Sequence, residues 1–428
     1  MTDESPQLHI VVEGIGKVVQ KYYVNPLSYI SGRWQGQISV TFTDESKYWQ
    51  HARKETREEN RQFIEKIKTW ADYLDKSNSE DKKKLEKLKA DVVFIATPDS
   101  THVKLAKKWL KPPDRCKQIF IEKPLDASLL RARELVYLQG KNENKVVALD
   151  HYRARMLDFF INNRFEEEII DKKLGGALKE ISFYMLEDGT GDKHEGPIEL
   201  EGRTSALKNG LILDMMPHAL AIIDKFLPVE LIEITGLKVG KYTFVKDNKS
   251  VEAGIPWETF GYVEFKYNEI KGKICVGKGV GGSEEFGKNS EVKLLEIVGG
   301  NGGKYRFDFR TPRPHKENPG VGAVTFIDRD GNESPGTPPN LIDDAYLALI
   351  DRIVRRNLLD DHTRLEFDLS VQKAKNFLIV LEDIRQGVKM LKRKLKVLPT
   401  YNIDKIKGAP LLEEITAELP EVLSVLSS

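Results

Sequence analysis

Two short segments carry residue types suited to chemistry on a hydroxyl group. Lys123 stands between Glu122 and Pro124 at the end of an apolar run, and His218 follows Asp214 by four positions within the sequence GLILDMMPH. Residues four apart share one face of a helix, so Asp214 is a suitable carboxylate partner for His218. A histidine beside a carboxylate suits a general base that removes a hydroxyl proton. A lysine ammonium can stabilise negative charge that develops on the same oxygen.

Both residues also have ordinary structural explanations. A histidine beside an apolar run often lies in a core or caps a helix, and Lys123 could form a salt bridge with Glu122 or lie on the surface. Adjacent residues on a strand point to opposite faces, which disfavours the Glu122–Lys123 bridge. We therefore expect a functional role for Lys123, whereas the segment around His218 does not decide the question by itself.

The elements that must position Lys123 are short, continuous apolar runs. Residues 92–98 (VVFIATP) and 118–124 (QIFIEKP) each stop at a proline, with a helical stretch between them. This pattern predicts parallel strands joined by a helical crossover, and ligands bind at the carboxyl ends of such strands. We also expect a cis peptide bond between Lys123 and Pro124, because X-Pro bonds adopt this form at small cost.

A third strand of this kind is expected at residues 145–149. It ends in the run Asp150-His151-Tyr152-Arg153, which would lie at the same carboxyl edge as Lys123. A strand-end turn with ordinary surface charges explains this run about as well as a ligand site does.

A glycine turn follows the first expected strand. Residues 8–13 form an apolar run, Gly14 and Gly16 come next, and a helical register extends from Lys17 to about residue 24, just before a proline. A strand, glycine turn and helix in this order let backbone N–H groups and a helix N-terminus face the pyrophosphate of a dinucleotide. The third position of the glycine fingerprint is Val19, which predicts a wider separation between helix and strand.

Asp44 ends the second expected strand, at residues 37–43. A carboxylate there can accept hydrogen bonds from the adenosine ribose hydroxyls and disfavours a 2′-phosphate, so it favours NAD over NADP. Two alternatives remain open: Asp44 could cap the next helix, and the nearby Ser46 and Lys47 could receive a phosphate.

The remaining pattern predicts two domains and a tail. Residues 1–150 form the dinucleotide-binding domain, with a charged insertion at 47–90 that we interpret as two amphipathic helices separated by a turn at 77–79. Residues 151–400 form a substrate-binding and oligomerisation domain. It contains a helix at 156–173 that stops at two glycines, and helices at 341–356 and 370–391 that pack back against the sheet or the first domain. Strands of a largely antiparallel sheet are expected at 178–186, 231–237, 259–267, 271–276, 293–298 and 305–309. Residues 401–428 form a C-terminal tail.

Composition excludes several classes of protein. The chain has 428 residues, with 67 Lys and Arg against 66 Asp and Glu, so no strong field attracts nucleic acid or a membrane. No run is apolar and long enough to span a bilayer. The two cysteines fit neither a disulfide framework nor a metal site, which favours a reducing cytoplasm and no metal. We expect a small-molecule substrate.

Four motifs together resemble the Gfo/Idh/MocA oxidoreductases, the family of glucose-fructose oxidoreductase and inositol dehydrogenase. They are ATPDSTH at 96–102, IEKP at 121–124, LDHYRARM at 149–156, and Gly210 with Asp214 and His218. The IEKPL and DHY segments also resemble glucose-6-phosphate dehydrogenase. The family resemblance implies an α/β Rossmann-like dinucleotide-binding domain followed by an α+β domain with a largely antiparallel open sheet.

The resemblance also implies roles for individual residues. His218 is similar to the general base, Asp214 to its partner carboxylate, and Lys123 to the lysine that orients the substrate hydroxyl beside the nicotinamide. The glucose-6-phosphate dehydrogenase resemblance adds Asp150 as a second partner for His218. The substrate-binding candidates are His151, Tyr152 and Arg153. The cofactor-binding candidates are Gly14, Gly16, Lys17, Asp44, Thr97, Pro98, His102, Glu122 and Lys123.

These observations predict an NAD(P)-dependent oxidoreductase that transfers a hydride between nicotinamide and a secondary alcohol or ketone of a sugar, a sugar derivative or a polyol. The alternative is a catalytically silent sensor or scaffold that keeps the fold and binds the dinucleotide. A sensor needs neither Lys123 nor His218. An open sheet that exposes one face often pairs with another subunit, so we expect a homodimer or homotetramer.

Overall fold

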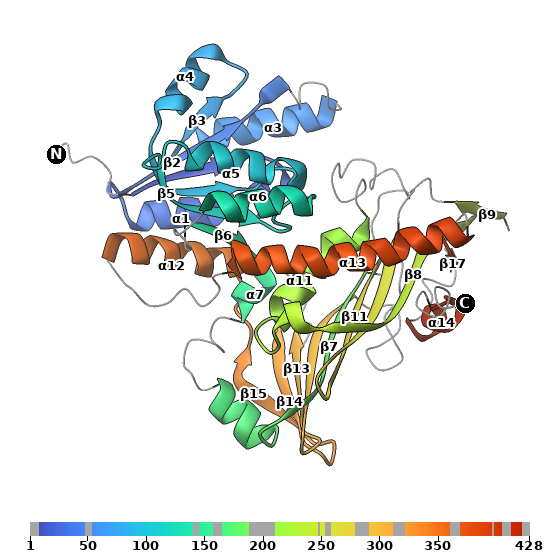
Figure 1. Ribbon diagram of the computed structural model, residues 1–428. Helices are drawn as coiled ribbons and strands as arrows, with labels where there is room; N and C mark the ends of the chain where they lie inside the picture. Colours follow the sequence, from blue (N-terminus) through green and yellow to red (C-terminus); the bar gives the residue numbers. More distant parts are fainter. Residues whose placement is uncertain are drawn as a thin grey trace. The chain divides into compact units, whose positions relative to one another are not determined.

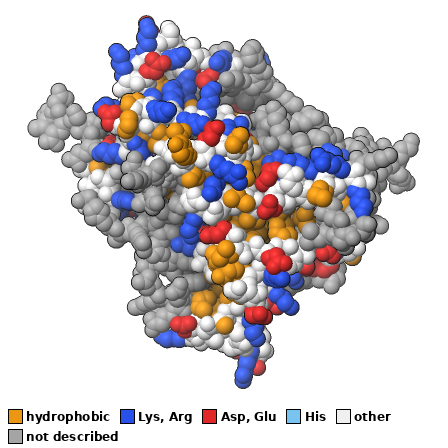
Figure 2. All heavy atoms as spheres, viewed as in Figure 1, with side chains coloured by type: hydrophobic (Ala, Val, Ile, Leu, Met, Phe, Trp, Pro, Cys, Tyr) orange, Lys and Arg blue, Asp and Glu red, His pale blue; other side chains and the backbone are white. Residues whose placement is uncertain are grey.

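The computed structural model describes residues 8–47, 54–139, 145–156, 165–187, 210–246, 249–252, 258–278, 291–310, 322–359, 369–395, 398–404 and 412–421. The chain forms two compact units, one of residues 1–154 with 344–375 and one of residues 155–343 with 376–428 (Figure 1). No helix in the described ranges is long and apolar enough to cross a membrane. On the face shown in Figure 2, Lys and Arg side chains are interspersed with Asp and Glu side chains, in keeping with the balanced composition.

The first unit is built on a seven-stranded sheet in the order β16-β6-β5-β4-β1-β2-β3. Six of these strands are parallel and β16 is antiparallel to β6. The order of the six is that of a Rossmann sheet, which confirms the predicted fold. The strands are β1 (Leu8–Glu13), β2 (Ile38–Asp44), β3 (Asp72–Asp75), β4 (Ala90–Ile95), β5 (Cys116–Glu122), β6 (Val146–Leu149) and β16 (Leu369–Ser370).

Helices flank this sheet because its central strands are apolar on both faces. Almost every residue of β1, β4, β5 and β6 is buried. Helix α1 (Val24–Arg33) packs with α12 (Ala345–Leu359), and α5 (His102–Leu110) packs with α6 (Leu129–Gln139) (Figure 1). The other described helices of this unit are η1 (Val19–Tyr23), α3 (Lys54–Ile67), α4 (Ser79–Lys87), η2 (Asp99–Thr101) and α7 (His151–Arg155).

Two expectations for the first unit were wrong. The helix after the glycine turn does not end near residue 24 but continues through η1 and α1 to Arg33. Pro26 lies in the first turn of α1, directly after the π-helical turn η1, where its missing N–H costs little. The insertion at 47–90 also contains a strand, β3, which lies between α3 and α4 in the sequence and pairs in parallel with β2.

The second unit is built on a ten-stranded sheet in the order β15-β14-β13-β12-β7-β11-β10-β8-β17, with β9 on β8. Only the pairs β7·β11 and β8·β17 are parallel, as expected for a largely antiparallel sheet. The strands are β7 (Leu178–Glu187), β8 (Glu233–Lys246), β9 (Lys249–Glu252), β10 (Phe260–Tyr267), β11 (Ile270–Lys278), β12 (Val292–Gly299), β13 (Lys304–Asp308), β14 (Ala323–Ile327), β15 (Glu333–Asn340) and β17 (Thr400–Asp404).

Helix α11 (Leu211–Ile223) packs on β7, β10 and β11 of this sheet. The other helices are η3 (Phe165–Lys173), η4 (Val229–Leu231), α13 (Val371–Leu395) and α14 (Leu412–Glu418). Part of the helix expected at 156–173 lies outside the described residues, and η3 is its described end. Gly175 and Gly176, with φ of 73° and 76°, stop it as predicted. The expected tail contains the edge strand β17 and the helix α14.

Candidate functional site

The carboxyl edge of the first sheet gathers most of the predicted site residues. Parallel strands end at one edge, so the residues that follow β1, β2, β4, β5 and β6 lie along it. In this order they are Gly14 and Gly16, then Asp44, then Thr97 and Pro98, then Lys123, and then Asp150 and His151.

The glycine turn is fixed by its two neighbouring strands. Gly14 has a φ of 105°, and its N–H donates to the Thr43 carbonyl at 2.7 Å. A Cβ there would lie 2.7 Å from the Ala96 carbonyl oxygen, so only glycine lets β1 approach the end of β4 this closely. A Cβ on Gly16 would meet no atom within 4 Å, and Gly16 and Lys17 are exposed. The turn therefore presents an open face to a ligand.

Val19, the departure from the glycine fingerprint, is completely buried. Its side chain belongs to the hydrophobic core and so does not occupy the open face beside Gly16.

The Asp44 carboxylate anchors this turn. One oxygen accepts the Ile15 N–H at 3.1 Å and the other accepts the Glu45 N–H at 2.7 Å. Burial raises the pKa of Asp44, although both N–H groups oppose this shift. A carboxylate has about four acceptor positions, so two remain for other donors. Ser46 and Lys47, the alternative phosphate ligands, both have partners within the protein. The Ser46 N–H donates to Asp75 at 3.1 Å, and the Lys47 ammonium lies 2.8 Å from a Glu45 carboxylate oxygen.

Glu122, at the end of β5, is held by two tyrosines that the sequence analysis did not single out. One of its oxygens accepts the Tyr23 hydroxyl at 2.5 Å and the Tyr346 hydroxyl at 3.0 Å. All three side chains are buried. Burial raises the pKa of Glu122, while the two hydroxyls and the Lys123 charge oppose that shift. Lys123 therefore follows a rigidly held residue, and its peptide bond to Pro124 is cis, as predicted.

An aromatic stack lies beside these tyrosines. The ring of Tyr22 stacks on Tyr346 at a centroid distance of 5.1 Å and on His151 at 6.1 Å. The His151 and Tyr346 rings are 5.8 Å apart and nearly parallel. His151, a predicted substrate residue, is thus oriented by aromatic side chains from η1 and α12. The only sequence signal for this stack is the Tyr22-Tyr23 pair soon after the glycine turn.

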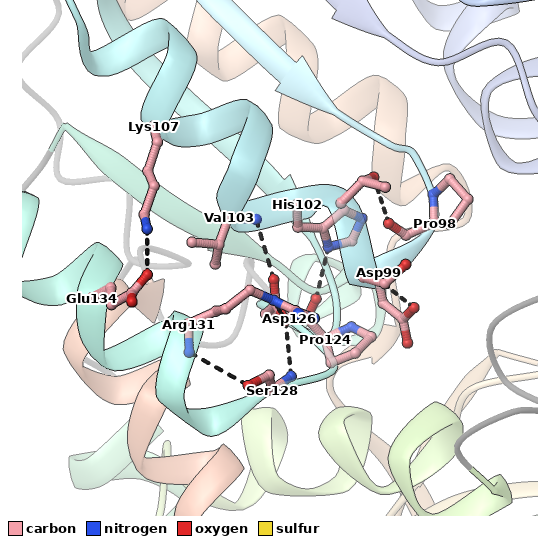
Figure 3. Close-up of polar contacts among 12 residues, drawn as sticks. Pro98, Asp99, His102, Val103, Lys107, Pro124, Asp126, Ser128, Arg131 and Glu134 are labelled. Carbon is pink, nitrogen blue, oxygen red and sulfur yellow. Dashed lines mark hydrogen bonds and ion pairs between the residues drawn. The ribbon is translucent and has the colours of Figure 1, made fainter.

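His102 connects the ends of β4 and β5 (Figure 3). Its Nδ1 lies 2.9 Å from the Pro124 carbonyl oxygen and its Nε2 lies 2.7 Å from the Thr97 carbonyl oxygen. The side chain is almost completely buried, and burial lowers its pKa. Both ring nitrogens therefore face the backbone, and His102 positions the two loops that the motif analysis placed along the cofactor. Pro98 is exposed, and the Thr97 hydroxyl lies 2.7 Å from that of Thr101.

Asp126 fixes the loop that follows Pro124 (Figure 3). Its completely buried carboxylate accepts the Val103 N–H at 3.3 Å, the Ser128 N–H at 2.8 Å and the Arg131 Nε–H at 2.8 Å. With His102, it ties helix α5 to the segment that carries Lys123.

The run after β6 is buried. Asp150, Tyr152 and Arg153 are each less than one tenth exposed, so an ordinary surface turn does not describe them. The Asp150 carboxylate accepts the Arg153 N–H at 2.9 Å and so begins helix α7. Burial raises the pKa of Asp150, and the charges of His151 and Lys123 oppose the shift.

In the second unit, α11 carries Asp214 and His218 on one face. Asp214 is partly exposed and His218 is 4% exposed. Gly210 precedes the helix with a φ of 86°, and a Cβ there would lie 2.0 Å from a Glu258 carboxylate oxygen. That oxygen also lies 3.4 Å from the Ile212 nitrogen, so Glu258 caps the helix start.

Glu258 predicts a measurable pH effect. Burial raises its pKa from an ordinary 4.5 to about 7, against the Ile212 N–H and the charges of Arg385 and Lys392. Between pH 4.5 and about pH 7, Glu258 binds more protons in the folded state than in the unfolded state. Its contribution to the free energy of unfolding therefore falls as the pH rises, by roughly 3 kcal/mol over this range. We expect Glu258→Gln to gain about that much stability relative to wild type between pH 5 and pH 8 in denaturant unfolding. The exposed Glu269→Gln is the control, and equal slopes for all three proteins would contradict the prediction.

Three comparisons with known proteins bear on this site. The model of the Gfo/Idh/MocA oxidoreductase family, with its NAD-binding Rossmann fold, matches residues 8–151. No curated protein sequence matches the chain. The structure is similar to KijD10, a 3-ketoreductase from Actinomadura kijaniata, with 12% identity, a TM-score of 0.58, and coverage of 94% of this chain and 99% of KijD10. An oxidoreductase from Bacillus cereus is similar at 16% identity and a TM-score of 0.57, over 88% of this chain and 95% of that one.

At 12% and 16% identity, the similarity to these two solved structures establishes the fold alone. The match over residues 8–151 confirms the resemblance to the Gfo/Idh/MocA oxidoreductases in the first unit. The resemblance to glucose-6-phosphate dehydrogenase is not supported, because the family model that matches residues 8–151 is that of the Gfo/Idh/MocA oxidoreductases.

Proposed function

Because residues 8–151 carry the NAD-binding Rossmann fold of the Gfo/Idh/MocA oxidoreductase family, we propose that the chain is an NAD(P)-dependent oxidoreductase acting on a secondary alcohol or ketone of a sugar, sugar derivative or polyol. The observation that carries the proposal is the carboxyl edge of the first sheet. There an open glycine turn after β1, an aspartate at the end of β2 and Lys123 after β5 lie along the same edge of the sheet.

The residues present fit a dinucleotide. The open face at Gly16 leaves space for a pyrophosphate, and the first N–H groups of the following helix have no partner within the helix. Asp44 retains acceptor positions for ribose hydroxyls. The bound nicotinamide would supply the hydride transfer, and the protein would orient the substrate against it.

We assign the proton chemistry to the chain's own side chains. His218 accepts the substrate hydroxyl proton, Asp214 orients His218, and the Lys123 ammonium stabilises charge on the oxygen. Lys123 belongs to the first unit and His218 to the second, so this assignment requires the two units to share one site. Asp150 remains a proposed second partner of His218.

A sugar-like substrate is supported by KijD10, whose solved complexes contain NADP and TDP-benzene. The direct test mixes the protein with NAD or NADP and follows nicotinamide absorbance over a panel of sugars and polyols, in both directions. Turnover of any member supports the proposal. Tight cofactor binding without turnover favours the silent sensor instead, and absence of binding to either cofactor contradicts both functions.

Asp44 should set the preference for NAD. A carboxylate at the end of β2 repels a 2′-phosphate, so we expect Asp44→Ser to shift the ratio of NADP to NAD affinity toward NADP by about tenfold. Calorimetric titration with each cofactor measures this ratio. Asp44→Asn keeps one acceptor for the Ile15 N–H and separates the loss of charge from disruption of the turn. An unchanged ratio in both variants would show that Asp44 only anchors the turn.

A further inference from the structure

Glu13, the last residue of β1, forms a buried ion pair with Lys76. The Glu13 side chain is completely buried and the Lys76 side chain is 11% exposed. One Glu13 oxygen contacts the Lys76 ammonium, and the other accepts the Trp109 indole N–H at 2.7 Å. A carboxylate at this depth is costly unless it is paired, so Lys76 and Trp109 stabilise its charged form.

Lys76 lies next to the ribose end of the proposed cofactor site. It directly follows β3, and its N–H donates to the Asp44 carbonyl at 2.8 Å. Asp44 pairs with Asp75 in the register of β2 and β3. The side-chain charges are close as well, because the Lys76 ammonium lowers and the Glu13 carboxylate raises the pKa of Asp44, whose main shift comes from burial. The four-carbon stem of Lys76 therefore starts within reach of any group bound at Asp44.

Two further cations interact electrostatically with Glu13. Its charge also acts on Lys108, at the end of α5, and on Arg115, just before β5. Burial is the main influence on the pKa of both cations and lowers it. Glu13 thus offsets the positive charges of Lys76, Lys108 and Arg115. Without it, the Lys76 ammonium would lack its carboxylate partner and would be available to an anion.

We propose that Glu13 sets cofactor preference by holding the Lys76 ammonium away from the adenosine ribose. With Lys76 bound to Glu13, the ribose meets the Asp44 carboxylate, which favours the two free hydroxyls of NAD. A released Lys76 would pair with the 2′-phosphate of NADP. This inference rests on the proposed function and extends it to two residues at the ends of β1 and β3, the strands on either side of β2.

The test is a binding measurement. Fluorescence titration of NADH and NADPH gives both dissociation constants for wild type, Glu13→Gln, Lys76→Met and the double variant. A new charge-assisted hydrogen bond to phosphate should tighten NADPH binding to Glu13→Gln by about tenfold. NADH binding should change by less than about threefold, because its ribose carries no phosphate. In the Lys76→Met background the gain should vanish, which shows that Lys76 mediates it.

A second variant distinguishes a change in cofactor preference from a loss of folding. Glu13→Asp keeps the charge and loosens the pair, so it should give a smaller gain of the same sign even if Glu13→Gln folds poorly. Thermal unfolding checks each variant. An unchanged ratio of NADH to NADPH affinity in folded Glu13→Gln or Glu13→Asp would overturn the inference and leave Lys76 as a loop anchor. Failure of wild type to bind either cofactor would instead reject the proposed function.

Discussion

Replacing His218 with Asn is expected to lower kcat by roughly a hundredfold to ten-thousandfold, the usual cost of losing a positioned general base. The dissociation constant for the nicotinamide cofactor should stay nearly unchanged, since His218 lies in the second unit and the glycine turn in the first. Stopped-flow or steady-state kinetics on a confirmed substrate, together with cofactor titration, separates the two quantities.

The pH profile gives an independent readout for His218. In wild type, the acidic limb of kcat/KM for alcohol oxidation should report the protonation of the base, and this limb should be lost in His218→Asn. Asp214→Asn should shift the limb and lower kcat less than the histidine variant does. His9→Asn is the matched control, because His9 lies on β1 of the first unit and its ring contacts the Lys89 carbonyl and the Thr41 hydroxyl. Wild-type turnover in His218→Asn would leave the histidine as a core residue of α11.

The sequence predicted the central strands of the first unit well, because β1, β4 and β5 are buried on both faces and therefore read as continuous apolar runs. It did not predict β3, whose four residues are partly or fully exposed and carry two charges. It also missed β15, since the prolines in ESPGTPPN argue against a strand. That segment is tolerated because it lies at the edge of its sheet.

In the candidate site, the sequence predicted residues that lie in local motifs but not their distant side-chain partners. Motifs located Lys123 and the glycine turn because their chemistry is local. The partners of Glu122 were not visible, because Tyr346 lies 224 positions away and returns to the first unit on α12. Glu13 was likewise read as the end of an apolar strand, and only the fold brings Lys76 to it from 63 positions away. A polar pair between distant positions produces no periodic pattern in the sequence, so pattern analysis cannot reveal it.

Lys123→Met should lower kcat by about a hundredfold to a thousandfold, because it removes the positive charge proposed to stabilise the substrate oxygen as its proton leaves. The effect should exceed any loss of cofactor affinity, since Glu122 keeps its hydrogen bonds to Tyr23 and Tyr346 in the variant. Lys123→Arg retains the charge with a different shape and should recover only part of the rate. Steady-state kinetics with both cofactor titrations measures these differences.

Lys117 provides the matched control on the same strand. Its side chain is 75% exposed and its ammonium pairs with Asp91 at 2.7 Å, so Lys117→Met removes a lysine from β5 at a site away from the strand's carboxyl end. Turnover should remain within about twofold of wild type, because exposed ion pairs contribute little. If Lys123→Met and Lys117→Met have the same turnover, Lys123 does not act on the substrate. If Lys123→Met loses cofactor binding and turnover in equal measure, its role is confined to holding the cofactor.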